Sequence, residues 1–224
     1  MLIGATLVVA AALLLFAMIA EDLLDGGGFI AHDVAVLHWF VDHRTELTIS
    51  VARVIGTLAS FTALLLAGIA LLLWLWRRGV NPILAASPVA ALALAGLAST
   101  TAKAMFDRPR PPLEARAAHA MLAAFPSGHS TDSAAFFLAA SAVIALAVMI
   151  RPRAQLLTVV VGGGMAGVVG ISRLVLGVHW LSDVVAGWAL GTAVAVAVVT
   201  TAWWFATRPA MARTPDAEPS AEPT

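Results

Sequence analysis

The sequence predicts an all-α fold: a polytopic membrane bundle of six transmembrane helices, with a short interfacial helix after the first. Two observations support this prediction. The 224 residues are 61% hydrophobic and only 12% charged, whereas a soluble domain carries about 25% charged residues. Six separate apolar stretches also come close to, or exceed, the roughly 20 residues that a helix needs to cross a bilayer.

The predicted spans follow one another along most of the chain. They cover residues 2–20, 47–76, 82–106, 129–150, 155–176 and 181–206. The first is interpreted as a retained anchor and not as a signal peptide, because no Lys or Arg precedes it. The second is longer than a bilayer requires, so we expect it to tilt or to project from the membrane.

Basic residues flank alternate ends of these spans. They are Arg77, Arg78, Arg151, Arg153, Arg208 and Arg213. Because basic loops stay in the cytoplasm, the pattern predicts a multi-pass protein of the cell inner (plasma) membrane with both termini in the cytoplasm.

The loops after the third and fifth spans then face the outside, yet they also carry cations. These cations are Lys103, Arg108, Arg110, Arg116 and Arg173. We interpret the exception as a sign that the extracytoplasmic face binds an anionic ligand. Arg108 and Arg116 are interpreted as solvated loop charges that contribute little to this binding.

Residues 29–43 have the apolar pattern of a short helix at the membrane interface. Four polar residues in this segment invite comparison with a metal site: His32, Asp33, His38 and His43. They do not share one helical face, so they are interpreted as solvated interfacial residues.

The chain is expected to form one membrane domain, residues 1–208, followed by a disordered cytoplasmic tail, residues 209–224, that is rich in Pro, Ala and Glu. The absence of cysteine excludes thiolate metal sites and cysteine nucleophiles. A formal net charge of zero gives no indication of a nucleic-acid partner. The oligomeric state is left open.

Three segments contain most of the polar chemistry. Residues 103–111 close the third span, residues 126–129 open the fourth, and residues 172–183 join the fifth to the sixth. In the predicted topology all three reach the same membrane face. Their chemistry is therefore expected to form one site.

Cations and a helix start in these segments suit a phosphate group. Lys103, Arg110 and Arg173 supply positive charge, and the arginine fork matches paired phosphate oxygens. The start of the fourth span offers unpaired backbone N–H groups to an anion. Gly128 lets the backbone approach the phosphate without an intervening Cβ.

Two histidines and an aspartate could perform the reaction. Asp183 follows His179 by one helical turn, so its carboxylate can fix the tautomer of the imidazole and leave the other nitrogen free to attack phosphorus. His129 is suited to protonate the departing oxygen. Asp132 is expected to line the cavity or to bond a neighbouring hydroxyl group.

Together the three segments resemble the signature motifs of the type 2 phosphatidic acid phosphatase superfamily, which are Lys-x6-Arg-Pro, Pro-Ser-Gly-His and Ser-Arg-x5-His-x3-Asp. Every signature position is matched, by Lys103, Arg110, Pro111, Ser127, Gly128, His129, Ser172, Arg173, His179 and Asp183. The resemblance covers about residues 103–191, and the six-span layout resembles the bacterial integral-membrane lipid phosphatase branch. The first hundred residues match only in hydropathy.

This resemblance implies a membrane lipid phosphatase that forms a phosphohistidine on His179, with Asp183 orienting the ring and His129 as general acid. It assigns the remaining motif residues to the substrate phosphate: Lys103, Arg110, Ser127, Gly128 and Arg173. It also implies that neither a divalent metal nor a cofactor is needed. The implied substrates are undecaprenyl diphosphate, phosphatidylglycerol phosphate or phosphatidic acid, with a slight preference for polyprenyl carriers because the site faces outward.

Two other functions remain open at this point. A lipid phosphotransferase on the same scaffold would pass the phosphoryl group from His179 to an acceptor other than water, and the motifs fit both reactions. An anionic-lipid transporter would account for the cations. It would, however, give His179 and Asp183 no role, and it would favour cations spread along a path.

Overall fold

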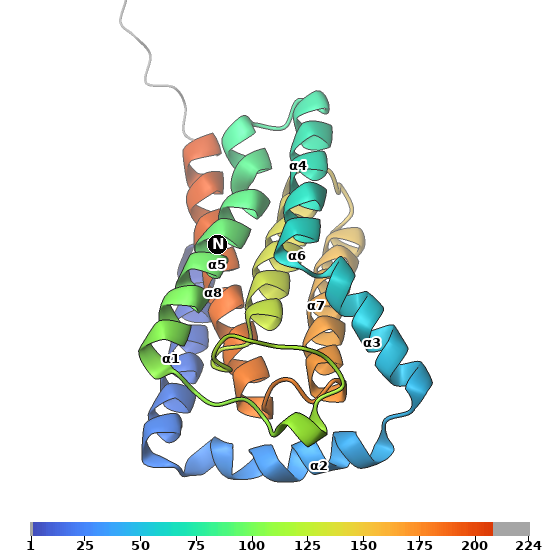
Figure 1. Ribbon diagram of the computed structural model, residues 1–224. Helices are drawn as coiled ribbons and strands as arrows, with labels where there is room; N and C mark the ends of the chain where they lie inside the picture. The colour runs from blue at the N-terminus through green and yellow to red at the C-terminus, as the bar shows by residue number, and fades with distance from the viewer. Residues whose placement is uncertain (1, 208–224) are drawn as a thin grey trace, which may run out of the picture.

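The chain folds as a bundle of helices, and the computed structural model describes residues 2–207. The predicted tail, residues 209–224, lies outside the described residues. All described elements are helical, in the order α1 (Leu2–Asp25), η1 (Gly28–His32), α2 (Asp33–His43), α3 (Glu46–Leu58), α4 (Phe61–Arg77), α5 (Pro82–Phe106), η2 (Leu113–Ala115), α6 (Gly128–Ala147), α7 (Pro152–Val175) and α8 (Leu181–Thr207). The predicted all-α membrane fold is confirmed (Figure 1).

Five of the described helices, α1, α5, α6, α7 and α8, are each long and apolar enough to cross a membrane. The second predicted span, residues 47–76, is not one helix. It consists of α3 and α4, which meet at an angle of 53°. Ser60 causes a new helix to begin, because its hydroxyl accepts a hydrogen bond from the backbone N–H of Ala63 (3.3 Å). The excess length of this span therefore reflects a break, at which α3 turns from the direction of α4 towards the end of α7 (Figure 1).

Helix α6 lies at the centre of the bundle, packed against α5, α7 and α8. Its approach to α8 is close because α8 presents glycines to it. A Cβ on Gly191 would lie 2.3 Å from the carbonyl oxygen of Thr131, and one on Gly187 would lie 2.8 Å from that of Ser127. Small residues allow this approach in membrane helices, and here they bring the starts of α6 and α8 together.

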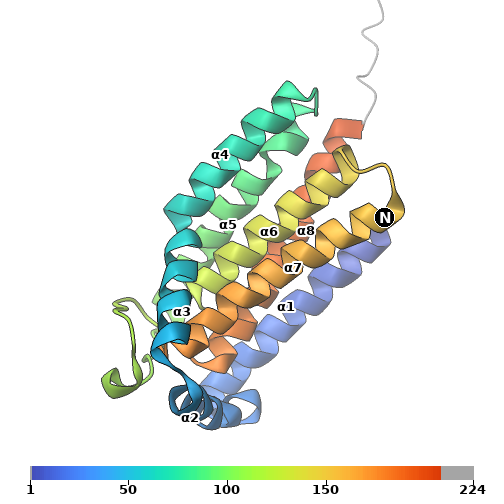
Figure 2. The ribbon, with the colours of Figure 1, turned by 90° about the vertical axis from the view of Figure 1, so that its right-hand side faces the viewer.

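The two ends of the bundle carry different loops and different charged residues. Figure 2 shows the N-terminus, the α4–α5 turn, the α6–α7 turn and the end of α8 at one end, with α2 and the loop between α5 and α6 at the other. Exposed arginines lie at the first end: Arg77, Arg78, Arg151 and Arg153. All three motif segments lie at the second, as the sequence predicts.

Helix α2 runs across the second end, roughly perpendicular to the bundle (Figure 1). This confirms a short helix after the first span. The expectation that its polar residues are all solvated is wrong for Asp33, which is only 2% exposed. His32, His38 and His43 are exposed.

Candidate active site

A cavity of about 320 Å³ opens at the end of the bundle that carries the motifs. Six parts of the chain contribute to it: the junction between α3 and α4, the end of α5, the following loop, the start of α6, the end of α7 and the α7–α8 turn. Predicted site residues among its lining are Lys103, Arg110, Gly128, His129, Arg173 and His179. The fold therefore joins segments that lie between residue 59 and residue 179 of the sequence around one space.

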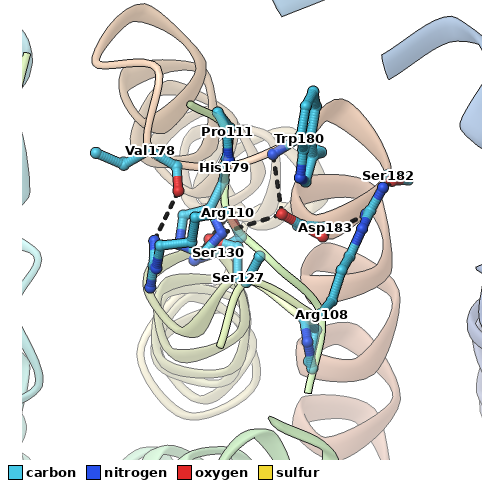
Figure 3. Close-up of polar contacts among 12 residues, drawn as sticks. Arg108, Arg110, Pro111, Ser127, Ser130, Val178, His179, Trp180, Ser182 and Asp183 are labelled. Carbon is cyan, nitrogen blue, oxygen red and sulfur yellow. Dashed lines mark hydrogen bonds and ion pairs between the residues drawn. The ribbon is translucent and has the colours of Figure 1, made fainter. Parts of the chain in front are cut away.

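His179 lies in the α7–α8 turn and is only 3% exposed. Its Nδ1 is 3.3 Å from Oδ2 of Asp183, and its Nε2 is 3.2 Å from Nη1 of Arg110 (Figure 3). Arginine has only donors, so Nε2 carries the lone pair and Nδ1 carries the proton. Burial lowers the pKa of His179 to about 4, although the hydrogen bond to Asp183 acts in the opposite direction. The ring is therefore neutral at pH 7, with its lone pair on Nε2 facing Arg110.

Asp183 is fully buried in the first turn of α8. Its Oδ2 also accepts a hydrogen bond from the backbone N–H of Trp180 (2.9 Å), and its Oδ1 accepts one from Nη1 of Arg108 (2.5 Å). The carboxylate is thus held on both oxygens and cannot turn away from the imidazole. Figure 3 shows this arrangement.

Arg108 is not a solvated loop charge, because only 7% of it is exposed. Besides Asp183, its guanidinium binds Oγ of Ser182 (2.7 Å) and Oδ2 of Asp33 (2.6 Å). Asp33 in turn accepts a hydrogen bond from the backbone N–H of Ser182 (2.9 Å). One buried cation therefore joins two buried carboxylates, one on the transverse helix α2 and one beside His179.

Sequence reasoning missed this network because Arg108 lies 75 residues from both Asp33 and Asp183 along the chain. A charged residue in a proline-rich loop is usually exposed, and nothing in the spacing of these residues shows that the loop folds inward. One feature of the sequence could have indicated the network: the acidic residues of α1 and α2 had no basic partner assigned to them.

The three predicted phosphate-binding cations line the cavity without a carboxylate partner at ion-pair distance in residues 2–207. Nζ of Lys103 donates to the carbonyl oxygens of Ala123 (2.8 Å), Ala124 (3.4 Å) and Pro126 (2.5 Å). Since Lys103 has carbonyl acceptors but no carboxylate at ion-pair distance among the described residues, an anion that enters the cavity is attracted to it.

The two arginines of this set also bind carbonyl groups. Arg110 donates to the carbonyl oxygens of Leu122 and Val178, both at 2.6 Å. Burial lowers the pKa of Arg110 below its ordinary value, but an arginine stays charged. Arg173, which is 6% exposed, donates to the carbonyl oxygen of Ala52 on α3 (3.0 Å).

Ser127 and Gly128 occupy different positions. Gly128 lines the cavity, and a Cβ on it would lie in ordinary contact with Oγ of Ser99 (3.7 Å) and Cε of Lys103 (3.8 Å). Ser127 does not line the cavity. It is fully buried, and its Oγ lies at the start of α6, where it accepts hydrogen bonds from the hydroxyl (3.0 Å) and the backbone N–H (3.5 Å) of Ser130. Its own backbone N–H binds the carbonyl oxygen of Asp183 (2.9 Å), so this residue joins α6 to α8.

Comparison with known proteins places these features in a family context. A family profile described as the PAP2 superfamily matches residues 84–207, more than half of the chain. The chain is 33% identical over 89 residues to phosphatidylglycerophosphatase B of Bacillus subtilis (strain 168). That alignment covers 40% of this chain and 43% of the relative, so it spans less than half the length of that curated protein.

Two solved structures share the fold. One is the crystal structure of the first transmembrane PAP2 type phosphatidylglycerolphosphate phosphatase from Bacillus subtilis, with a TM-score of 0.74 and 22% identity over 90% of this chain and 94% of that one. The other is the crystal structure of LpxE from Aquifex aeolicus, with a TM-score of 0.58 and 18% identity over 75% of this chain and 94% of that one. At these identities the likeness shows the helical architecture alone.

Proposed function

Because the chain belongs to the PAP2 superfamily, in agreement with the resemblance of its three motifs, we propose that it is a membrane phosphatase that removes phosphate from a lipid phosphate or diphosphate through a phosphohistidine on His179. One observation supports this proposal most directly. The neutral imidazole is fixed by Asp183 and directs Nε2 towards the cluster of cations in the cavity. A transporter would need the cations but not this oriented nucleophile.

In the first step the substrate phosphoryl group binds among Lys103, Arg110 and Arg173. Its oxygens compete with the backbone carbonyls that these cations bind in the free enzyme. Nε2 of His179 attacks phosphorus, and the bond from phosphorus to the leaving oxygen breaks. His129 donates a proton to that oxygen, so the departing group leaves without a negative charge.

In the second step a water molecule attacks the phosphohistidine. His129, now neutral, accepts a proton from the water, and the bond between phosphorus and Nε2 breaks. Inorganic phosphate leaves, and both histidines return to their initial states. Fixed cations in a largely buried site stabilise the charge on the phosphoryl oxygens in both transition states.

We place the site at the extracytoplasmic face of the cell inner membrane, with both chain ends in the cytoplasm. The exposed arginines at the opposite end of the bundle support this orientation. Among the cations of the site, Arg173 is buried and Lys103 and Arg110 are half-buried around the cavity, so we assign them to the ligand and not to the topology. We also propose that hydrolysis needs no divalent metal, since the protein's own cations can hold the phosphate.

Phosphate release from the purified protein tests the proposal. Wild type and His179→Ala are assayed in detergent with EDTA, against undecaprenyl diphosphate, phosphatidylglycerol phosphate, phosphatidic acid and a water-soluble phosphate ester. We expect release from at least one lipid by the wild type and none by His179→Ala. Equal release by both proteins would exclude His179 as the nucleophile, and no release from any lipid would contradict the phosphatase function.

The same assay in heavy-oxygen water separates hydrolysis from phosphotransfer. Hydrolysis places one heavy oxygen in the released phosphate, because water attacks the phosphohistidine. A phosphotransferase would release phosphate only slowly, and would respond to an added lipid or sugar alcohol by forming a new phosphate ester.

A further inference from the structure

Asp132 is a polar side chain of the cavity that the proposed reaction does not use. It lies on α6 and lines the same space as His129 and His179. Its Oδ1 is buried and has no hydrogen-bond partner among the described residues. Buried carboxyl oxygens in proteins are nearly always hydrogen-bonded. Oδ1 is enclosed against the neighbouring helices, so the oxygen that can reach the contents of the cavity is Oδ2, which also has no hydrogen-bond partner among the described residues. A donor to this carboxylate is therefore expected from a molecule in the cavity.

The nearby cation does not supply this donor. An ammonium group has three N–H donors, and Nζ of Lys103 already has three carbonyl acceptors within 3.4 Å. On its other side, Oδ1 of Asp132 lies next to α5, where a Cβ on Gly96 would be 3.8 Å away, beside the ring of Phe61. These neighbours offer it no donor.

The position of Asp132 relative to His129 indicates which part of a substrate it would meet. The two residues are three apart on one helix, so their side chains are neighbours on the same face. His129 is the proposed proton donor to the leaving oxygen. Asp132 then lies one turn further along α6, next to the atoms of the leaving group that are closest to that oxygen.

We propose that Asp132 accepts a hydrogen bond from a hydroxyl group adjacent to the phosphate-bearing carbon of the leaving alcohol. This inference rests on the proposed phosphatase function and narrows its substrate class. It selects lipid phosphomonoesters with a glycerol phosphate headgroup, such as phosphatidylglycerol phosphate, whose leaving alcohol carries a free neighbouring hydroxyl.

The other candidate substrates lack this donor. In phosphatidic acid the neighbouring oxygen carries an acyl chain. In a polyprenyl diphosphate the leaving group is itself a phosphate, which presents acceptor oxygens to the acceptor oxygen of Asp132. The cavity chemistry therefore disfavours the polyprenyl carriers that the outward-facing site suggests.

A matched pair of substrates tests this role. Phosphatidylglycerol phosphate is compared with an analogue in which propane-1,3-diol replaces the headgroup glycerol, so that only the hydroxyl is missing. We expect wild type to favour the hydroxyl-bearing substrate by at least about tenfold in kcat/KM. Asp132→Ala should reduce this preference to within about threefold, because it lowers kcat/KM for phosphatidylglycerol phosphate and not for the analogue.

Two further variants control for indirect effects. Ser133→Ala alters the adjacent α6 residue and should keep the wild-type preference. In the described part of the chain the hydroxyl of Ser133 bonds only within its own helix (3.3 Å to the carbonyl oxygen of Ser130). Asp132→Asn keeps an acceptor oxygen in a side chain of the same shape. It should show an intermediate preference, because a neutral acceptor forms a weaker hydrogen bond. Free glycerol 3-phosphate, assayed alongside, shows whether the headgroup alone is recognised or the lipid is required.

The outcomes are distinct. An equal loss of both lipid activities in Asp132→Ala would assign Asp132 to catalysis or folding and overturn the inference. An unchanged preference in Asp132→Ala and Asp132→Asn would also overturn it, while leaving the phosphatase function intact. If wild type released phosphate from neither substrate, both the phosphatase function and the inference would be contradicted.

Discussion

His179 and its neighbours show how single side chains prepare the chemistry. Asp183 orients the ring, and Arg108 holds Asp183 through its other oxygen. The histidine motif therefore works as part of a chain of contacts that reaches Asp33 on α2. Motif spacing alone predicts the pair His179 and Asp183, since one helical turn separates them. It does not predict Arg108, whose partners lie far away in the sequence.

Replacement of Arg108 by alanine is expected to reduce kcat by more than about tenfold. The change leaves two buried carboxylates without their shared cation, and breaking a buried ion pair costs about 3–5 kcal/mol. Arg108→Lys should restore part of the thermal stability but less of kcat, because one ammonium cannot make the forked contacts. Kinetic and thermal-unfolding measurements on both variants check this.

Arg116 provides a matched control in the same loop, because within residues 2–207 its guanidinium binds only the carbonyl oxygen of Pro111 (2.6 Å). Arg116→Ala should alter kcat by much less than Arg108→Ala. Similar effects of the two replacements would contradict a specific role for the Arg108 network.

The lowered pKa of His179 predicts the acid limb of the pH profile. Since burial lowers this pKa to about 4, the neutral nucleophile persists well below the ordinary histidine value of about 6.5. As pH falls, kcat/KM should therefore decline with an apparent pKa near 4, the lowered value of His179. The profile is first corrected for the second ionisation of the substrate phosphate. A limb near the ordinary value would show that His179 is not desolvated in the free enzyme.

At the scale of helices, most of the fold follows from apolar length. The helix at Pro82–Phe106 begins and ends where the sequence predicts, because Asn81 caps it and Pro occupies its first position. The break between α3 and α4 was missed, although Ser60 is a recognisable cap within the apolar stretch. The break has a consequence for the site, since it lets α3 lean over the end of α7 and contact Arg173.

Gly56 on α3 is expected to be necessary for the position of Arg173. A Cβ at this residue would lie 2.1 Å from Nη2 of Arg173, so Gly56→Ala should displace the guanidinium. We expect kcat/KM to fall by about tenfold, the effect of weakening one charged hydrogen bond, with little loss of thermal stability. Gly167→Ala on α7, where a Cβ would meet nothing within 4 Å, should leave kcat/KM unchanged. Equal kcat/KM in the two variants would contradict the account.

At the scale of the whole molecule, charge is divided between the two ends of the bundle. One end carries exposed arginines, and the other carries the cavity with its buried and half-buried cations, together with the exposed Arg53. The sequence predicts this division from loop charges, because the bilayer forces successive spans to alternate in direction. It could not predict which loop cations turn inward, since that depends on contacts between distant segments.

The absence of cysteine from the chain allows a direct test of orientation. Single cysteines are introduced at Glu114, which is exposed at the site end, and at Arg151, which is exposed at the other end. A membrane-impermeant thiol reagent added to intact spheroplasts should label Glu114→Cys and not Arg151→Cys. Labelling of Arg151→Cys alone would place the site on the cytoplasmic face.

The central claim is that a phosphoryl group passes through His179. Detection of phosphohistidine by mass spectrometry, after rapid mixing with lipid substrate and quenching under conditions that preserve it, tests this claim most directly. The account predicts one added phosphoryl group on the peptide that contains His179, in wild type and not in His179→Ala. Rapid phosphate release by wild type with no phosphoryl group on His179 at any time during turnover would contradict it.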